Sequence, residues 1–86
     1  MAKRFAYFYF TRREPERILL FVPQHVAYWN GLNLNAYMGG PFADRSGGLI
    51  TFEVRDIETA TEYANSDPFV TLDLLENSWV REWSVE

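Results

Sequence analysis

The residues with the clearest chemical potential are one histidine and one aspartate. His25 is the only histidine among the 86 residues, and an imidazole can accept or donate a proton near neutral pH. Asp67 stands in the segment 65–69, Asn-Ser-Asp-Pro-Phe, where one helix ends and another can begin. A carboxylate that binds an imidazole fixes its tautomer and its orientation, which suits a general acid–base pair. We expect an imidazole nitrogen within about 2.6–3.2 Å of an Asp67 oxygen, at the edge of a small pocket.

Both residues also have a purely structural interpretation. A histidine on the apolar stripe of a helix is more often a core residue than a catalyst. An aspartate before proline at a helix start is an ordinary N-cap. The two roles of Asp67 are compatible, because one oxygen can cap the helix while the other binds His25. The sequence therefore leaves open an enzyme, a module that binds a metabolite without turnover, and an interaction scaffold.

A second group of residues is a candidate for ligand binding. Gly40 and Pro41 follow a predicted strand, and the missing glycine side chain would let a ligand approach the backbone. Their spacing matches neither a dinucleotide-binding nor a phosphate-binding loop. Arg13 or Arg45 is a candidate partner for a substrate carboxylate. Tyr28 is a candidate for lining a pocket that holds a planar or aromatic molecule.

The composition excludes several other classes of function. The chain has no cysteine, so it has no disulfide framework and no thiolate zinc site, and a lone histidine makes no recognisable metal-ligand set. The formal net charge is −4, which disfavours a nucleic-acid-binding face. No apolar run is long enough to cross a membrane. After the first residues we expect a strand and not a signal peptide. We expect a cytoplasmic protein that binds no nucleic acid, membrane, metal or cofactor.

The apolar pattern predicts the elements that position these side chains. Arg4–Phe10 is a continuous apolar run and predicts a strand that is buried on both faces. Helical spacing of apolar residues, with proline at the first position, predicts a helix over Pro23–Leu32 that carries His25 in its first turn. The remaining predicted elements are strands at Ala36–Gly39, Leu49–Val54 and Asn77–Val85, a helix over Ile57–Ala64 capped by Asp56, and a short helix from Pro68 through Leu75.

This order, β-α-β-β-α-β, predicts an α+β ferredoxin-like fold with a four-stranded antiparallel sheet and its helices on one face. Two main helices can cover only one face of such a sheet. The first strand is nevertheless apolar on both faces, and its two alternating sets are Phe5, Tyr7 and Tyr9 against Ala6, Phe8 and Phe10. Soluble monomers rarely expose an apolar face of this size. We therefore expect a homodimer in which an identical sheet covers the bare face.

Several short motifs, in order along the chain, resemble the YCII-related family. They are Pro23–Tyr28, Gly39–Phe42, Ala60–Ala64, Ser66–Phe69 and Val80–Trp83. The resemblance spans nearly the whole chain. It implies a ferredoxin-like dimeric α/β barrel in which two sheets pack face to face.

The resemblance also implies an active site around a histidine and an aspartate, which correspond here to His25 and Asp67. Most members have no established substrate, so the resemblance implies an architecture and a site but no reaction. The chain departs from the family pattern between Tyr28 and Gly40. From the residues and the resemblance together, we expect a cofactor-free enzyme for proton transfer, of isomerase or lyase type, on a small aromatic or carboxylated metabolite. The alternative is a module of the same fold that binds a small molecule without turnover.

Overall fold

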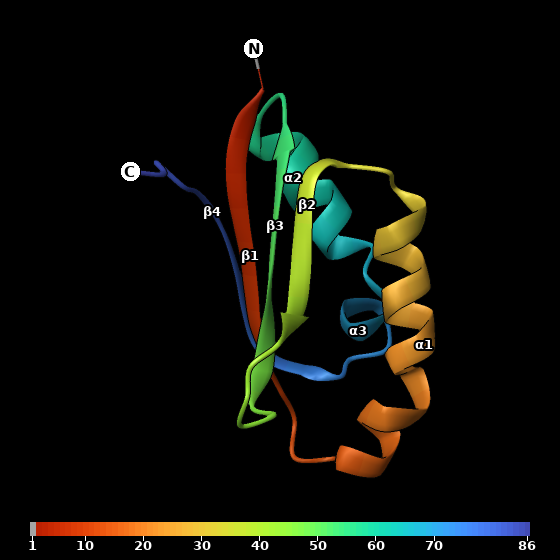
Figure 1. Ribbon diagram of the computed structural model, residues 1–86. Coiled ribbons are helices and arrows are strands. Elements are labelled where there is room, and N and C mark those ends of the chain that lie inside the picture. The colour runs from red at the N-terminus through yellow and green to blue at the C-terminus, as the bar shows by residue number, and fades with distance from the viewer. Residues whose placement is uncertain (1) are drawn as a thin grey trace.

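The computed structural model describes residues 2–86, and over this range a four-stranded antiparallel sheet carries three helices on one face (Figure 1). Within the same range no helix is long and apolar enough to cross a membrane. The strand order is β2-β3-β1-β4. The elements are β1 (Lys3–Thr11), α1 (Pro15–Gly31), β2 (Asn35–Pro41), β3 (Gly47–Val54), α2 (Ile57–Asn65), α3 (Pro68–Thr71) and β4 (Leu75–Glu82). The predicted ferredoxin-like arrangement is confirmed.

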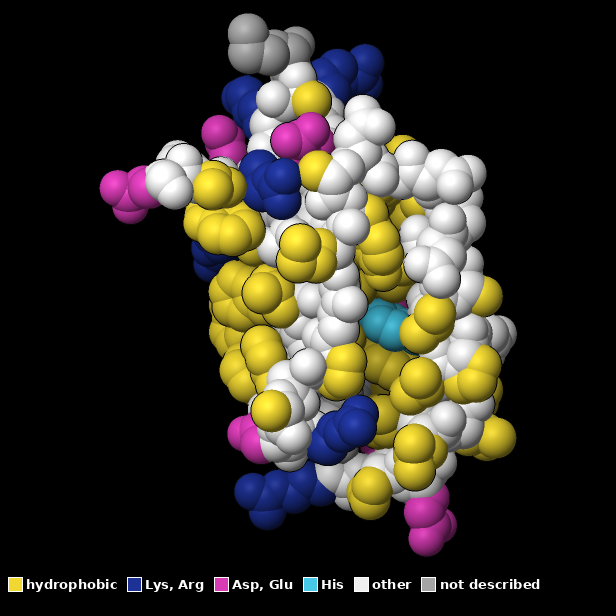
Figure 2. All heavy atoms as spheres, viewed as in Figure 1, with side chains coloured by type: hydrophobic (Ala, Val, Ile, Leu, Met, Phe, Trp, Pro, Cys, Tyr) yellow, Lys and Arg dark blue, Asp and Glu magenta, His cyan; other side chains and the backbone are white. Residues whose placement is uncertain are grey.

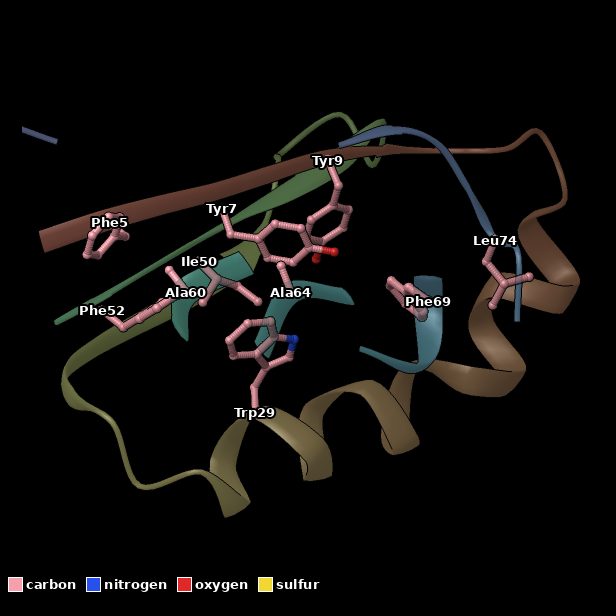
Figure 3. Close-up of a cluster of buried hydrophobic side chains, with 10 residues drawn as sticks. All are labelled: Phe5, Tyr7, Tyr9, Trp29, Ile50, Phe52, Ala60, Ala64, Phe69 and Leu74. Atoms are coloured by element: carbon pink, nitrogen blue, oxygen red, sulfur yellow. The ribbon is translucent and has the colours of Figure 1, made fainter. Parts of the chain in front are cut away.

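The hydrophobic core lies between the sheet and the helices (Figure 3). Trp29 of α1 stacks on Tyr7 of β1 with ring centroids 5.4 Å apart, and it also packs against Phe52 of β3 at 5.6 Å. Ala60 and Ala64 lie one turn apart on α2 and are both buried. Their short side chains let α2 approach the sheet closely, whereas the large indole of Trp29 spans the wider gap beneath α1.

α1 begins at Pro15. The start at Pro23 that we predicted from the sequence is wrong. Pro15 occupies the first turn, where a missing N–H group costs nothing. Pro23 lies inside the helix on its exposed side and removes only the backbone hydrogen bond to Leu19, which is 72% exposed, so water can replace that bond. His25 consequently lies in the helix interior. Its predicted place in the first turn is wrong, and the positive end of the helix dipole does not act on it.

The chain between α3 and β4 also differs from the prediction. α3 ends at Thr71 instead of continuing to Leu75, because Asp73 has a φ of 57°, in the left-handed region that a right-handed helix cannot include. β4 then begins at Leu75 and ends at Glu82, so the strand predicted at 77–85 starts and ends earlier. This early start lets β4 pair with β1 from Phe5 to Thr11, the C-terminal end of that strand.

β2 and β3 are both longer than predicted, and part of the expected loop at 40–48 belongs to them. Gly47 and Gly48 pair with Phe10 and Tyr9 of β1. A Cβ atom at Gly47 would collide with the backbone carbonyl of Tyr9. The glycines therefore extend the strand because only a residue without a side chain lets the two backbones lie this close.

The sheet face turned away from the helices is rich in apolar side chains. Phe8 of β1 stacks on Trp79 of β4 with ring centroids 5.3 Å apart, and Phe10 packs against both Trp79 and Phe42. We call this surface the open sheet face; its central residues are Ala6, Phe8, Phe10, Met38, Leu49, Thr51 and Trp79. Asn77 and Arg81 of β4 lie on the same face, opposite Phe10 and Ala6. Figure 2 shows apolar side chains gathered on the side of the molecule where β1 and β4 lie. Within residues 2–86, no helix covers this face.

Candidate active site

Asp67 lies at the junction of α2 and α3 and is completely buried. The following proline starts α3, and Asp67 is the N-cap: its Oδ1 accepts a hydrogen bond from the Phe69 backbone N–H at 2.9 Å. The same oxygen lies 2.8 Å from Nδ1 of His25. The contact between His25 and Asp67 that the sequence predicted is therefore present, and the capping role and the pairing role occur together.

The second oxygen of Asp67 binds two aromatic residues that the sequence did not single out for the site. Oδ2 accepts hydrogen bonds from the Tyr7 hydroxyl at 3.2 Å and from Nε1 of Trp29 at 3.1 Å. Oδ2 thus binds the Trp29 N–H and Oδ1 binds the Phe69 N–H. Both of these groups can donate a hydrogen bond but cannot accept one. Asp67 is therefore an acceptor hub that joins α1, β1 and α3 through one buried carboxylate.

The ring of His25 is held on several sides. Its plane stacks on Phe69 with centroids 4.1 Å apart and an angle of 10°. In the neutral imidazole, donation from Nδ1–H to the Asp67 carboxylate leaves the lone pair on Nε2, and that nitrogen lies 3.3 Å from the Tyr9 hydroxyl. The residue as a whole is 7% exposed. This tautomer places a proton acceptor, and not a donor, on the outer nitrogen.

A cavity of about 1020 Å³ opens between α1 and the strands β1, β2 and β3, and His25 lines it. Figure 2 shows the cyan histidine at the bottom of a hollow that is bordered mainly by apolar side chains. Those apolar walls include Ile18, Val22, Ile50 and Phe69. The volume is ample for a small organic molecule, and an apolar lining with a few directed polar groups is typical of ligand sites.

The structure brings most of the predicted ligand-binding residues to this cavity. Gly40 and Pro41 of β2 line it, as do Arg13 after β1 and Arg45 in the β2–β3 connection. Tyr28 does not line it. Its hydroxyl donates to the backbone carbonyl of Tyr63 at 2.7 Å, because its position on α1 faces α2 rather than the sheet opening.

Three arginines line the cavity, but they differ in their partners. Arg12 is bound to Asp73, with Nη2 2.9 Å from Oδ1. Within residues 2–86, neither Arg13 nor Arg45 forms an ion pair. These two guanidinium groups therefore remain available to an anionic group of a ligand. Over the same range, no three His, Asp or Glu side chains are grouped as metal ligands.

The buried tyrosines next to Asp67 resist ionisation. Burial raises the pKa of Tyr7 well above its ordinary value, and the negative charge of Asp67 raises it further. The pKa of Tyr9 is raised for the same two reasons in the same order. Both hydroxyls therefore stay protonated over the physiological range and act as hydrogen-bond donors.

These raised values predict a loss of stability at alkaline pH. Below pH about 10 both tyrosines are protonated in the folded and unfolded chains, so their contribution to stability is fully present. Above it the unfolded chain ionises first, and the free energy of unfolding falls as the pH rises toward the folded pKa values. A titration of the tyrosinate absorbance band alongside circular dichroism should show part of the signal appearing only on unfolding. Tyr7→Phe should shrink that part, and ionisation of all five tyrosines before unfolding would contradict the prediction.

Comparison with known proteins gives a family and a fold. Residues 6–84 match the YCII-related domain, whereas no curated protein matches this chain. One similar solved structure is 5-chloro-2-hydroxyhydroquinone dehydrochlorinase (TftG) from Burkholderia phenoliruptrix AC1100 in complex with 2,5-dihydroxybenzoquinone. It has a TM-score of 0.80 and 20% identity, and the alignment covers 94% of this chain and 93% of that chain.

Two further solved structures are more distant. An antibiotic biosynthesis monooxygenase has a TM-score of 0.59 and 14% identity, with coverage of 100% of this chain and 99% of that chain. The protein SO0527 from Shewanella oneidensis has a TM-score of 0.58 and 10% identity, with coverage of 95% and 88%. At these identities the three structures show a shared fold and nothing more. The match to the family itself covers almost the entire sequence, and the chain belongs to the YCII-related family.

Proposed function

We propose that the protein is an enzyme that transfers protons on a small organic molecule, with His25 as general acid or base and Asp67 as its positioning residue. The observation that carries the proposal is the orientation of the imidazole. Nδ1 is bound to a buried carboxylate that is itself held by three other donors, and the opposite nitrogen lies beside the cavity. An imidazole fixed in one tautomer, with its lone pair beside a ligand-sized space, is arranged as a general base.

The chemistry that suits this site is an elimination or an isomerisation. In both, a C–H or O–H bond of the substrate breaks, the proton moves to Nε2 of His25, and the electron pair stays on the substrate. In an elimination this pair forms a new double bond and a leaving group departs with its own electrons. In an isomerisation the proton returns to a different atom. The similarity to a dehydrochlorinase solved with a quinone supports the first reaction, on an aromatic substrate.

The walls of the cavity favour a ligand with an apolar ring and an acidic group. Ile18, Val22 and Phe69 offer apolar surface, while Arg13 and Arg45 supply positive charge. The backbone of Gly40 forms part of the cavity wall, and the space where a side chain would begin is open. We propose that the ring lies against the apolar walls and that the arginines bind a carboxylate or another anionic oxygen.

We also propose that the functional unit is a homodimer formed through the open sheet face. The face carries stacked aromatic side chains, and Met38 on its edge strand is 71% exposed. A second copy related by a two-fold axis presents the same residues and can bury them. The site described above lies on the other side of the sheet, so dimerisation leaves its mouth accessible.

The first test is His25→Gln, which keeps a polar side chain of similar length but removes the proton acceptor. A thermal-shift screen of hydroxylated and carboxylated aromatic compounds, including 2,5-dihydroxybenzoquinone, supplies the ligands to be assayed for turnover. We expect kcat for the compound turned over to fall about a hundredfold or more, with little change in KM. Gln24→Ala, on the exposed side of the same helix, is the control and should behave as wild type.

Two results would count against an enzyme. Full turnover by the His25→Gln variant would remove the histidine from the mechanism. Ligands that bind the wild-type protein but are never converted, and that bind the variant more weakly, would instead identify a binding module.

A further inference from the structure

Tyr9 has an unusual position for a core residue, because it is 4% exposed and yet lines the cavity. Its ring is held edge-on against His25 and Phe69, with centroids 5.7 and 5.9 Å away, and lies 5.2 Å from the ring of Tyr7. On β3 its pairing partner is Gly48, and a Cβ atom there would collide with the Tyr9 hydroxyl. The ring is therefore fixed, and only the hydroxyl hydrogen is free to rotate.

The hydroxyl of Tyr9 lies next to the nitrogen that a substrate must reach. It donates to Nε2 of His25 across 3.3 Å, a long hydrogen bond that a ligand atom can replace. A substrate atom that approaches Nε2 from the cavity also comes within hydrogen-bond distance of the Tyr9 oxygen, because the two protein atoms lie so close together. Once displaced from Nε2, the O–H group can rotate toward that substrate.

We propose that Tyr9 is a second catalytic residue, whose hydroxyl donates a hydrogen bond to the substrate oxygen that becomes negative when His25 removes a proton. In this step an O–H or C–H bond of the substrate breaks and its proton forms an N–H bond at Nε2 of His25. The electron pair moves to a phenolic or enolic oxygen, and Tyr9 stabilises that oxyanion without giving up its own proton. The substrate class is thus a phenol, an enol or a carbonyl compound with an acidic neighbouring C–H.

Two features make Tyr9 a donor in this role and not a second base. Burial and the charge of Asp67 raise its pKa, so its hydroxyl stays protonated. The donor is also in place before the charge develops, because the ring is already packed, and a preorganised donor in a water-poor site stabilises an oxyanion strongly.

The inference rests on the proposed function, and its test uses 4-nitrophenol and several more and less acidic substituted phenols as probes. Their anions are coloured, so absorbance reports whether the bound molecule is ionised. We expect wild-type protein to bind these probes as phenolates at a pH where the free molecules are mainly protonated. Tyr9→Phe keeps the ring and its packing but should bind the phenolates about tenfold to a hundredfold more weakly.

A merely structural role of Tyr9 would not change which protonation state is bound, so the bound ionised fraction is the decisive measurement. Tyr28→Phe is the matched control: it also removes a hydrogen-bonded tyrosine hydroxyl, but outside the cavity, and it should bind as wild type. If Tyr9→Phe ionises the probes as wild type does while His25→Gln does not, the role of Tyr9 is overturned and the proposed function stands. If wild-type protein binds none of the probes as an anion, both are overturned.

Discussion

Replacing Asp67 with alanine is expected to lower the free energy of unfolding by about 4 kcal/mol or more. The substitution leaves four buried donors without a partner: Nδ1–H of His25, the Tyr7 hydroxyl, Nε1–H of Trp29 and the Phe69 backbone N–H. Each unsatisfied donor costs about 1–3 kcal/mol, and the costs are not fully additive. Small domains have about 5–15 kcal/mol in total, so the variant should be barely folded.

Asp56 provides a matched control because it is also an aspartate at a helix N-cap. Its side chain accepts from the backbone N–H of Thr59 at 2.8 Å, but it makes no buried contacts to other elements. Asp56→Ala should therefore cost only about 1 kcal/mol. Urea unfolding of both variants at one protein concentration makes the comparison. Equal losses would mean that Asp67 is only a helix cap and not the hub of the site.

The order of the elements could be predicted from the sequence because the apolar residues of each segment recur with the spacing of a helix or of a strand. The start of α1 could not, because two prolines compete for the first helical position. Pro15 follows polar residues, and Pro23 follows a segment whose apolar period is ambiguous. Either proline could therefore occupy the first helical turn, and a proline is seldom predicted inside a helix because it removes a backbone hydrogen bond. It is tolerated here because it lies on the solvent side, a fact that depends on how the helix packs. The same packing decides that His25 lies in the helix interior.

The contact between His25 and Asp67 was predictable, but the rest of the site was not. Tyr7, Tyr9 and Trp29 read in the sequence as core aromatics, which they also are, and no local pattern distinguishes a tyrosine whose hydroxyl meets a carboxylate. Those hydrogen bonds join residues 16 to 60 positions apart in the chain. Only the packing of α1 across the sheet brings them together.

At the open sheet face, the structure decides between two interpretations of β1 that the sequence leaves open. The alternation in β1 left two sets of residues as equal candidates for the bare face. In the structure Phe5, Tyr7 and Tyr9 are buried beneath the helices, whereas Phe8 and Phe10 point the other way. Any partner sheet must therefore pack against the second set, and its most central large side chain is Phe8, which pairs across the sheet with Leu49 and Trp79.

Substituting glutamate for Phe8 is expected to separate the proposed dimer. By two-fold symmetry one substitution brings two carboxylates into the middle of an apolar interface, and each buried charge costs several kcal/mol. An obligate interface of this kind buries roughly 2,000 Å² in total. We expect the dissociation constant of the dimer to rise about a thousandfold or more. Sedimentation at low micromolar concentration should show wild-type protein at about twice the chain mass and the Phe8→Glu variant without that species.

Leu20→Glu is the matched control, because Leu20 is 70% exposed on α1, away from the open sheet face. It introduces the same charge at an exposed leucine and should leave the dimer unchanged. The separated Phe8→Glu chain should also lose much of its circular dichroism, since in the proposed dimer a domain this small depends on the apolar area that its partner would cover. A wild-type protein that sediments as a folded monomer would refute the dimer. Aromatic side chains such as Phe8, Phe10 and Trp79 would then need another partner to explain why they face outward from the sheet.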